Sequence, residues 1–181
     1  VGGCINSDCR IGWTNILEMY DPATDSWITK APMPTARSAM VGGVIAGKFY
    51  VAGGMQTCGP CTGLTTLEVY DPATDTWATR ASMPTAVAQM GGAVINGKLY
   101  VVGGLVDNTT FLGALMVYDP ATDAWTTKAP MPTPRAALGV SAVNGILYAV
   151  SGWDASFTPV HTVEASDPDT DSWTTVASIP T

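Results

Sequence analysis

Tyr70-Asp71-Pro72-Ala73-Thr74-Asp75-Thr76-Trp77 is the stretch that decides the fold, because related stretches recur along the whole chain. Each consists of an aspartate-proline turn followed at a fixed distance by a tryptophan, and the tryptophans are Trp27, Trp77, Trp125 and Trp173, spaced 50, 48 and 48 residues apart. A small pair precedes each turn: Gly2-Gly3, Gly53-Gly54, Gly103-Gly104 and, in degenerate form, Ser151-Gly152. A fixed period of this length indicates one unit that is repeated and packs against its neighbours.

Each repeat predicts four short antiparallel strands. In the second repeat, residues 40–46 and 49–52 are apolar runs separated by a turn at Gly47, and the equivalent Asn-Gly turns at 96–97 and 144–145 favour a type I′ hairpin. Residues 65–70 and 77–80 flank the aspartate-proline turn, where proline fixes φ and the aspartates accept hydrogen bonds from turn amides. No stretch has a sustained helical period, so the predicted fold class is all-β.

The combination of diglycine, tyrosine and tryptophan in four-stranded units of this length resembles the kelch repeat. The resemblance covers the whole chain and implies a kelch-type β-propeller with four-stranded antiparallel blades. We expect three complete blades and one partial blade, at residues 34–83, 84–131, 132–181 and 1–33. Because Val1 falls at the end of a second strand, we expect the chain to be part of a larger propeller, of six or seven blades as is usual in the family. Ring closure by several copies and a four-bladed toroid are the alternatives.

Two positions change together between the repeats. The second repeat has Arg37 and Glu68 at these positions, and the fourth has Arg135 and Glu164. The third repeat has the uncharged Val87 and Met116 instead. Removing one partner of a buried ion pair costs about 3–5 kcal/mol, whereas replacing both by apolar groups can be neutral. The correlation therefore predicts an ion pair inside each charged blade. An anion-binding role for the arginines at the propeller mouth is the alternative.

Four cysteines occupy two equivalent loops, Cys4 and Cys9 in one and Cys58 and Cys61 in the next. Disulfides within each loop, Cys4–Cys9 and Cys58–Cys61, would indicate an oxidising compartment. A tetrahedral zinc site built from all four thiolates, free thiols and bridges between blades are the alternatives.

The sequence nominates no catalytic centre. His161 is the single histidine, and no nucleophile or orienting acid stands at a suitable spacing from it. The carboxylates mostly belong to the repeated turns, so we expect neither catalysis nor a cofactor or metal. Fifteen acidic and eight basic side chains give a net charge of -7, which disfavours nucleic-acid partners and membrane insertion.

The expected binding face is the one on which kelch propellers commonly dock partners, formed by the loops after the diglycines and the loops leading into the innermost strands. The candidate contacts there are Trp13, Met55, Gln56, Gln89, Leu105, Asp107, Asn108, Trp153 and Asp154. Trp13 and Trp153 break the periodic tryptophan pattern, which makes them the best candidates for contact with a sugar ring or partner surface, and capping of a blade edge is the alternative. Asn108-Thr109-Thr110 is also an N-glycosylation acceptor.

We therefore predict a secreted or cell-surface module without catalysis of its own. Its partner would be a protein or glycan ligand, or further copies or blades of the same protein. The competing prediction is a carbohydrate-handling enzyme domain of the sialic acid mutarotase or galactose oxidase type, two activities found on this fold. The tyrosine, histidine and cysteine constellation of the copper oxidase cannot be assembled from a single histidine.

Overall fold

The computed structural model describes residues 1–4, 12–56 and 62–180. In these ranges every regular element is a β-strand, which confirms the all-β prediction. They contain no helix long and apolar enough to cross a membrane.

The strands form three complete four-stranded sheets and a smaller unit at the N-terminal end, which we call blades 1 to 4 in chain order. Blade 1 has the strand pair β3 (Leu17–Asp21) and β4 (Ser26–Lys30), with the short pair β1 (Gly3–Cys4) and β2 (Trp13–Thr14) below it. Blade 2 is β5 (Val41–Ile45), β6 (Lys48–Ala52), β7 (Leu67–Asp71) and β8 (Thr76–Arg80). Blade 3 is β9 (Gly91–Ile95), β10 (Lys98–Val102), β11 (Leu115–Asp119) and β12 (Ala124–Lys128). Blade 4 is β13 (Gly139–Val143), β14 (Ile146–Val150), β15 (Val163–Asp167) and β16 (Ser172–Val176).

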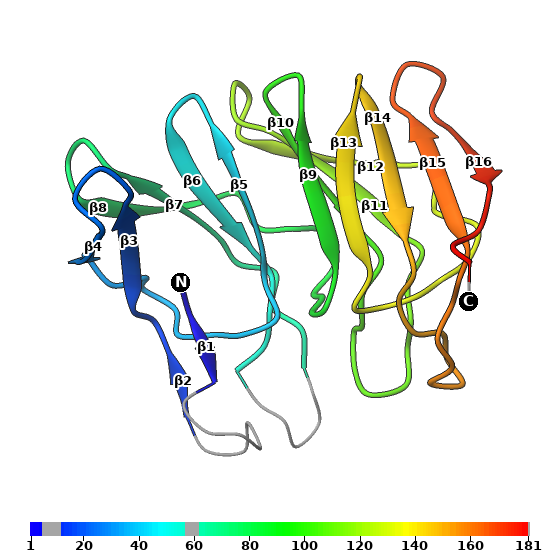
Figure 1. The fold of residues 1–181 in the computed structure, drawn as a ribbon, viewed down its shortest axis with the longest axis horizontal. Helices are drawn as coiled ribbons and strands as arrows, with labels where there is room; N and C mark the ends of the chain where they lie inside the picture. The colour runs from blue at the N-terminus through cyan, green and yellow to red at the C-terminus, as the bar shows by residue number, and fades with distance from the viewer. Residues whose placement is uncertain (5–11, 57–61, 181) are drawn as a thin grey trace.

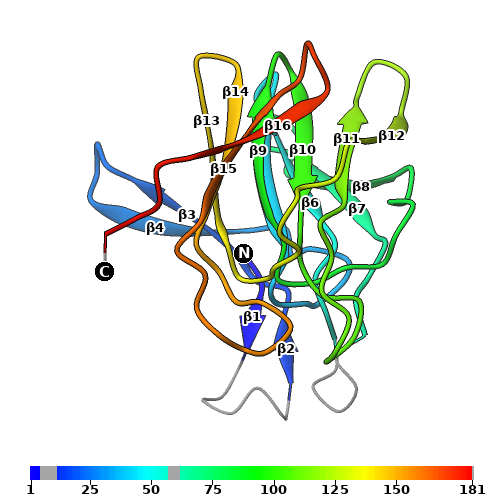
Figure 2. The same cartoon turned by 90° about the vertical axis from the view of Figure 1, so that its right-hand side faces the viewer.

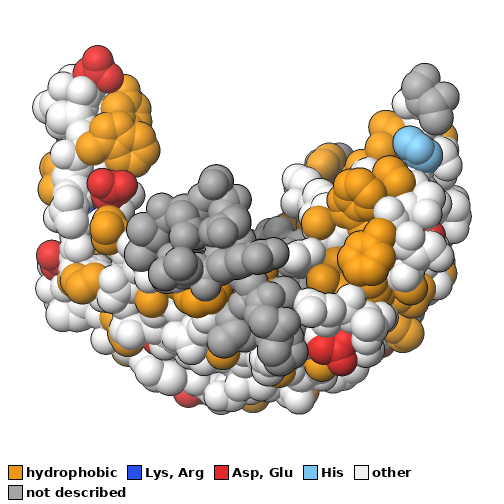
Figure 3. Space-filling view, turned by 90° about the horizontal axis from the view of Figure 1, so that it is seen from below, with side chains coloured by type: hydrophobic (Ala, Val, Ile, Leu, Met, Phe, Trp, Pro, Cys, Tyr) orange, Lys and Arg blue, Asp and Glu red, His pale blue; other side chains and the backbone are white. Residues whose placement is uncertain are grey.

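Each strand pairs antiparallel with the next one in the chain, so every complete blade is a meander of four strands. The blades stand side by side, with the tight hairpin turns at one end and the longer loops at the other (Figures 1 and 2). Seen from the loop end, the molecule is a crescent around an open centre (Figure 3). The four-stranded blades predicted from the repeat are therefore present, with blade 1 partial.

The repeated aspartates and tryptophans join each blade to the one before it. Trp77 Nε1 donates a hydrogen bond to the carbonyl of Ala31 at 2.8 Å, and the N–H of Ala31 donates to Asp75 Oδ1 at 2.9 Å. We call this pair of bonds the seam lock. It recurs where Trp125 and Asp123 meet Ala81, and where Trp173 and Asp171 meet Ala129. The sequence predicted these residues only as turn and packing residues, so their reach into the neighbouring blade is a finding of the structure.

The tyrosine of the repeat supports the seam lock. The hydroxyl of Tyr70 donates to Asp75 Oδ1 at 2.6 Å, and its ring packs on Trp77 with centroids 5.3 Å apart. Burial together with this hydrogen bond raises the pKa of Tyr70 to about 12. The same hydrogen bond, with a further one from the backbone of Ala31, lowers the pKa of Asp75.

The hydrophobic core lies in the seams between blades. Between blades 2 and 3, β7 residues Leu67 and Val69 pack toward the buried Leu99, Val101 and Met116 of blade 3. The seam between blades 3 and 4 repeats this arrangement with Leu115 and Val117 facing Leu147 and Ala149. Each blade therefore depends on its neighbour for burial, as expected of a repeat architecture.

The diglycine lets one blade approach the next. Gly53 and Gly54 have φ of +61° and +96°, and the N–H of Gly54 donates to the carbonyl of Val87 in blade 3 at 3.0 Å. A Cβ atom at Gly53 would collide with that carbonyl and with the Met90 side chain. Glycine alone combines an unstrained positive φ with the absence of a Cβ atom, which explains why the pair recurs.

Both buried ion pairs expected from the correlation are present. Arg37 Nη2 lies 2.8 Å from Glu68 Oε2, and Arg135 Nη1 lies 2.9 Å from Glu164 Oε2, with side chains at most 1% exposed. Each pair lies inside one blade. Burial lowers the pKa of both arginines, against the opposing effect of the glutamate charges. In blade 3 the equivalent Val87 and Met116 are buried and belong to the seam core instead.

Candidate binding pocket on the loop face

The loop face is formed by the loops that follow β6, β10 and β14 and by the segments that enter β5, β9 and β13. At equivalent positions in these entering segments, Ala39, Gln89 and Ala137 all adopt positive φ, between 51° and 55°. The N–H of Gln89 donates to the carbonyl of Ala39 at 2.9 Å, and the N–H of Ala137 donates to the carbonyl of Gln89 at 2.8 Å. A continuous row of backbone hydrogen bonds therefore crosses three blades and forms the base of the loop face.

Bridges between extended segments place the loop side chains above this row. Leu105 pairs with both Ala88 and Phe111 in blade 3, and Trp153 pairs with both Ala136 and Pro159 in blade 4. The side chains of Leu105 and Trp153 thus occupy the same position in successive blades. Phe111 stands where blade 4 has Pro159, blade 2 has Gly63 and blade 1 has Trp13, so blade 3 is the one complete blade with an aromatic ring at this position.

A pocket of about 290 Å³ opens between blades 3 and 4 on this face. Its walls are apolar apart from one amide and one indole N–H, and its lining residues are Gln89, Leu105, Phe111, Ala137, Trp153 and Phe157. The rings of Phe111 and Phe157 meet edge to face, with centroids 5.5 Å apart. Trp153 and Phe157 are 46% and 61% exposed, so the pocket presents aromatic surface to solvent. Figure 3 shows a hydrophobic cluster on this face close to the single histidine, His161.

The loop that carries Phe157 is held by Asp154. Asp154 Oδ1 accepts hydrogen bonds from the N–H groups of Ser156 and Thr158, and the N–H of Phe157 donates to the Asp154 carbonyl at 2.9 Å. Phe157 has a φ of +54°, a left-handed conformation that costs a residue with a side chain about 1–2 kcal/mol. A bulky aromatic residue is therefore kept exposed in a strained conformation, an arrangement that marks candidate functional positions.

Asp107 supports the loop of blade 3 in the same way. Its Oδ1 accepts from the N–H groups of Thr109 and Thr110 at 2.8 and 2.7 Å, and these bonds lower its pKa. The carboxylates of Asp107 and Asp154 are thus engaged within their own loops. Asn108, next to Asp107 in the blade 3 loop, is exposed.

Three other predicted contacts, in blades 1 and 2, lie away from the pocket. Trp13 is half-buried, and its Nε1 donates to Ser38 Oγ at 3.2 Å. Met55 is only 8% exposed, and the exposed Gln56 donates its amide to the carbonyl of Ala36 at 2.9 Å. Of the nine predicted contacts the pocket therefore brings together three, Gln89, Leu105 and Trp153. Sequence reasoning missed Phe111 and Phe157, although Phe111 occupies the position that Trp13 has in blade 1, and Trp13 had been predicted as a contact.

The cysteine predictions fall outside the described residues. Cys9, Cys58 and Cys61 are not described, and for Cys4 only the backbone in β1 is. His161 is exposed, and the described ranges contain no cluster of three His, Cys, Asp or Glu residues able to hold a metal ion.

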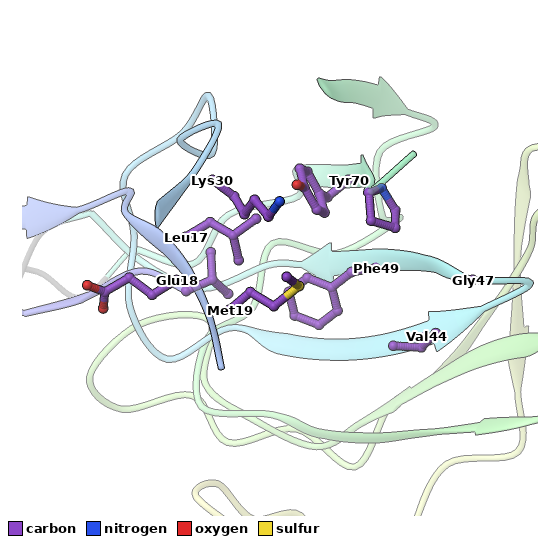
Figure 4. A pocket seen from close by; sticks show the side chains of 10 residues that line it. Leu17, Glu18, Met19, Lys30, Val44, Gly47, Phe49 and Tyr70 are labelled. Carbon is purple, nitrogen blue, oxygen red and sulfur yellow. The ribbon is translucent and has the colours of Figure 1, made fainter. Parts of the chain in front are cut away.

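A second hollow, of about 380 Å³, lies in the seam between blades 1 and 2, away from the loop face (Figure 4). Leu17 and Met19 of β3 line one side, and Val44, Phe49 and Tyr70 of blade 2 line the other. Complete blades have two inner strands at this level, whereas the described part of blade 1 has none beside β3. We therefore regard this hollow as an incomplete seam and the loop-face pocket as the candidate binding site.

Comparison with known proteins agrees with this architecture. The family model described as the KLHDC2/KLHL20/DRC7 Kelch-repeats domain matches residues 1–180. The chain therefore belongs to the kelch-repeat family, whose propeller domains generally mediate protein interactions.

The solved structure of YjhT superposes on this chain with a TM-score of 0.81 and 21% sequence identity. The match covers 91% of this chain and 60% of that one, so the chain spans somewhat less than two thirds of that protein's length. At this identity the likeness shows the fold. No curated protein matches the chain.

Proposed function

We propose that this chain is a non-catalytic interaction module, and that a protein partner inserts a bulky uncharged side chain into the pocket between blades 3 and 4. The observation that carries the proposal is the exposed aromatic wall formed by Trp153 and Phe157. Large exposed aromatic residues around a small apolar pocket are typical of the anchor positions of protein interfaces.

The chemistry of the pocket favours a protein side chain over a sugar. A pyranose buries several hydroxyl groups, each of which needs a hydrogen-bond partner. Among the side chains of the lining residues, those of Gln89 and Trp153 alone carry a polar group. An aromatic, leucine or methionine side chain needs none, and burying one contributes about 1.5–3 kcal/mol. The volume of about 290 Å³ accommodates one such side chain.

The charge of the surroundings narrows the partner further. The loop face shows acidic side chains and almost no basic ones among its described residues (Figure 3), and the chain as a whole carries a net charge of -7. Basic residues flanking the apolar anchor would increase the association rate, with a dependence on salt. The partner segment we propose is therefore an apolar anchor between basic residues.

We further propose that the module acts outside the cell or at its surface. The glycosylation acceptor supports this location, because Asn108 is exposed on the loop beside the pocket. The paired cysteine spacing in the first two repeats supports it as well.

Amide chemical-shift mapping by NMR tests the binding proposal. N-acetylphenylalaninamide is expected to bind weakly and to shift the amides of Leu105, Phe111 and Phe157, and Trp153→Ala is expected to abolish these shifts. Val44→Ala, at an exposed apolar position far from the loop face, is the matched control and should bind normally. Shifts at the pocket caused by methyl galactoside but not by the amide would overturn the protein-partner proposal.

The enzyme alternative has its own test. N-acetylneuraminic acid interconverts between anomers, and exchange spectroscopy measures the rate. We expect the rate with protein to equal the rate without it. Acceleration that disappears in a loop-face variant would establish the carbohydrate-handling alternative instead.

A further inference from the structure

The seam between blades 3 and 4 contains a further hollow, of about 440 Å³, at its hairpin-turn end. We call it the hairpin-end hollow. The blades on both sides of it are complete four-stranded sheets. Tyr100 and Val117 are its buried lining residues in blade 3, and Pro168 and Asp169 line it from the β15–β16 turn of blade 4. Most of its other lining side chains are polar, in contrast to those of the loop-face pocket.

The hollow lies where blade 4 lacks the tyrosine of the repeat. In blade 3 that tyrosine is Tyr118, and in blade 4 its place is taken by Ser166. In the seam between blades 2 and 3, the ring of Tyr118 packs on the ring of Tyr50, with centroids 5.8 Å apart. Tyr100 is the equivalent of Tyr50 in the next seam, and Ser166 offers it no ring. The serine therefore leaves the space in front of Tyr100 open.

The hydrogen-bond acceptor for the missing hydroxyl is still present. In blades 2 and 3 the tyrosine hydroxyl donates to the aspartate of the seam lock, at 2.6 and 2.7 Å. In blade 4 this aspartate is Asp171, which accepts from the N–H of Ala129 but, among the described residues, from no hydroxyl. Tyr100 is only 7% exposed and lines the hollow, and within the described ranges its hydroxyl has no hydrogen-bond partner. A ligand in the hollow can therefore bond to both groups.

The hollow also has an additional negative charge, because Asp169 stands where blade 3 has Ala121. Burial raises the pKa of Tyr100, and the carboxylates of Asp169 and Asp171 contribute to this rise, so both charges act on the hollow. The two lysines that line the hollow already lie 2.8 and 3.8 Å from other aspartates, Lys98 from Asp119 and Lys128 from Asp171. The charge of Asp169 therefore remains to favour a cation and to disfavour an anion.

We propose that the hairpin-end hollow binds a small phenol, with its ring in the place of the tyrosine ring that blade 4 lacks. The ring packs between Tyr100 and Trp173, as the rings of Tyr50 and Trp125 flank Tyr118 in the preceding seam. Its hydroxyl donates to Asp171. This inference concerns a different site from the loop-face pocket and does not depend on the proposed function.

The orientation of the ring indicates a free phenol rather than a tyrosine of another protein. In Tyr118 the carbon para to the hydroxyl leads to the backbone of β11, so the para position of the bound ring faces Ser166 of β15. A tyrosine residue carries its own chain at that position, and β15 occupies the space that this chain would need. The ligand therefore has an unsubstituted para position, and a short substituent at the meta position, preferably an ammonium group, leads away from β15.

NMR titration with phenol tests the proposal. Phenol is expected to shift the indole N–H of Trp173 and the amide of Val117 saturably. Anisole, which has no O–H donor, is expected to bind at least tenfold more weakly. Ser166→Tyr fills the hollow with the residue of the repeat and is expected to weaken phenol binding at least tenfold. Ser166→Ala leaves the hollow open, so this matched control should bind phenol like the wild type.

The charge at Asp169 has a separate test with two meta-substituted phenols. 3-Hydroxybenzylamine is expected to bind at least fivefold more tightly than 3-hydroxybenzoate, and Asp169→Ala is expected to reduce this ratio. Equal affinities of the two phenols for the wild type would overturn the selection by charge.

Circular dichroism shows whether Ser166→Tyr folds, and Ser166→Leu, which fills the hollow with a smaller side chain, replaces it if it does not. The absence of saturable shifts at Trp173 overturns the proposal. So does a filled variant that binds phenol like the wild type, or anisole that binds as well as phenol. Shifts confined to Leu105 and Phe111 would place the phenol in the loop-face pocket and would overturn the proposal as well.

Discussion

Breaking the ion pair between Arg37 and Glu68 tests how a blade tolerates buried charge. Both side chains are at most 1% exposed, and the two charged atoms lie 2.8 Å apart. Within the described part of the chain, Arg37→Val leaves the Glu68 carboxylate in the blade interior with the hydroxyl of Thr35, 2.6 Å away, as its one side-chain partner. An uncompensated buried charge costs about 3–5 kcal/mol, a large part of the total stability of about 5–15 kcal/mol of a typical domain. Glu68→Met is expected to cost a similar amount.

The double variant Arg37→Val/Glu68→Met should behave differently, because it reproduces the Val87 and Met116 of blade 3. Those residues are 0% and 1% exposed and pack in the seam core without any charge. The remaining losses are the hydrogen bond from Thr35 to Glu68 and the one from Arg37 to the carbonyl of Val51, about 1 kcal/mol each. The double variant is therefore expected to lie within about 1–2 kcal/mol of the wild type, although it carries both substitutions that are severe alone.

Urea unfolding followed by tryptophan fluorescence measures these free energies by linear extrapolation. Lys48→Met is the matched control, because Lys48 and Asp71 also lie 2.8 Å apart but their side chains are 45% and 27% exposed. It should cost less than about 1 kcal/mol. The reasoning is refuted if the double variant is as unstable as either single variant, or if both single variants unfold like the wild type.

Three further predictions concern the seams and the pocket. Gly54→Ala is expected to cost about 2–4 kcal/mol in urea unfolding, because its Cβ would lie 2.6 Å from the carbonyl of Ser38 at a φ of +96°. Gly97→Ala, with a φ of +73° and nothing within 4 Å, is its control and should cost only about 1–2 kcal/mol. Hydrogen bonds from the Ala81 N–H and the Tyr118 hydroxyl lower the pKa of Asp123 in the folded state, so its stabilising effect is complete above the unfolded pKa of about 4 and is lost as pH falls through the folded value. Thermal unfolding between pH 6 and pH 2 should therefore show a smaller acid loss for Asp123→Asn than for the wild type, and equal losses would contradict this assignment. Phe157→Asn is expected to keep stability within about 1 kcal/mol, since asparagine tolerates positive φ, while it weakens binding of the amide probe in the NMR assay. A large loss of stability would show that the ring is a packing residue.

The strands and turns could be predicted because each depends on residues close together in the sequence. The Asn96-Gly97 turn requires positive φ, and the structure has 49° and 73° at these residues. The ion pairs could be predicted for a different reason, since the repeats provide an internal comparison. Because both charges are absent together in blade 3, the comparison indicates which arginine pairs with which glutamate. Periodicity alone does not give this information.

The seam locks were beyond this reasoning. Asp75 and Trp77 have local explanations as turn and packing residues, and these explanations are sufficient. Their bonds to Ala31 span 44 and 46 residues, and they depend on the angle at which one blade meets the next. No pattern along a single strand encodes that angle. The repeated alanine after the fourth strand was visible in the sequence, but its meaning required the neighbouring blade.

The pocket was harder to predict because it lies where the repeats differ. Its strained wall, Phe157, and its partner Phe111 come from loops that differ from blade to blade, and the positions equivalent to Phe111 hold Trp13, Gly63 and Pro159, so periodicity carries little information about them. The seam residues, in contrast, recur from blade to blade, because each bonds to a residue of the neighbouring blade. A change at Trp125 disturbs two blades at once, whereas a change at Phe157 disturbs one loop that Asp154 holds independently. Binding specificity can therefore vary on the loop face while the propeller stays intact, which is the physical reason to seek the partner there.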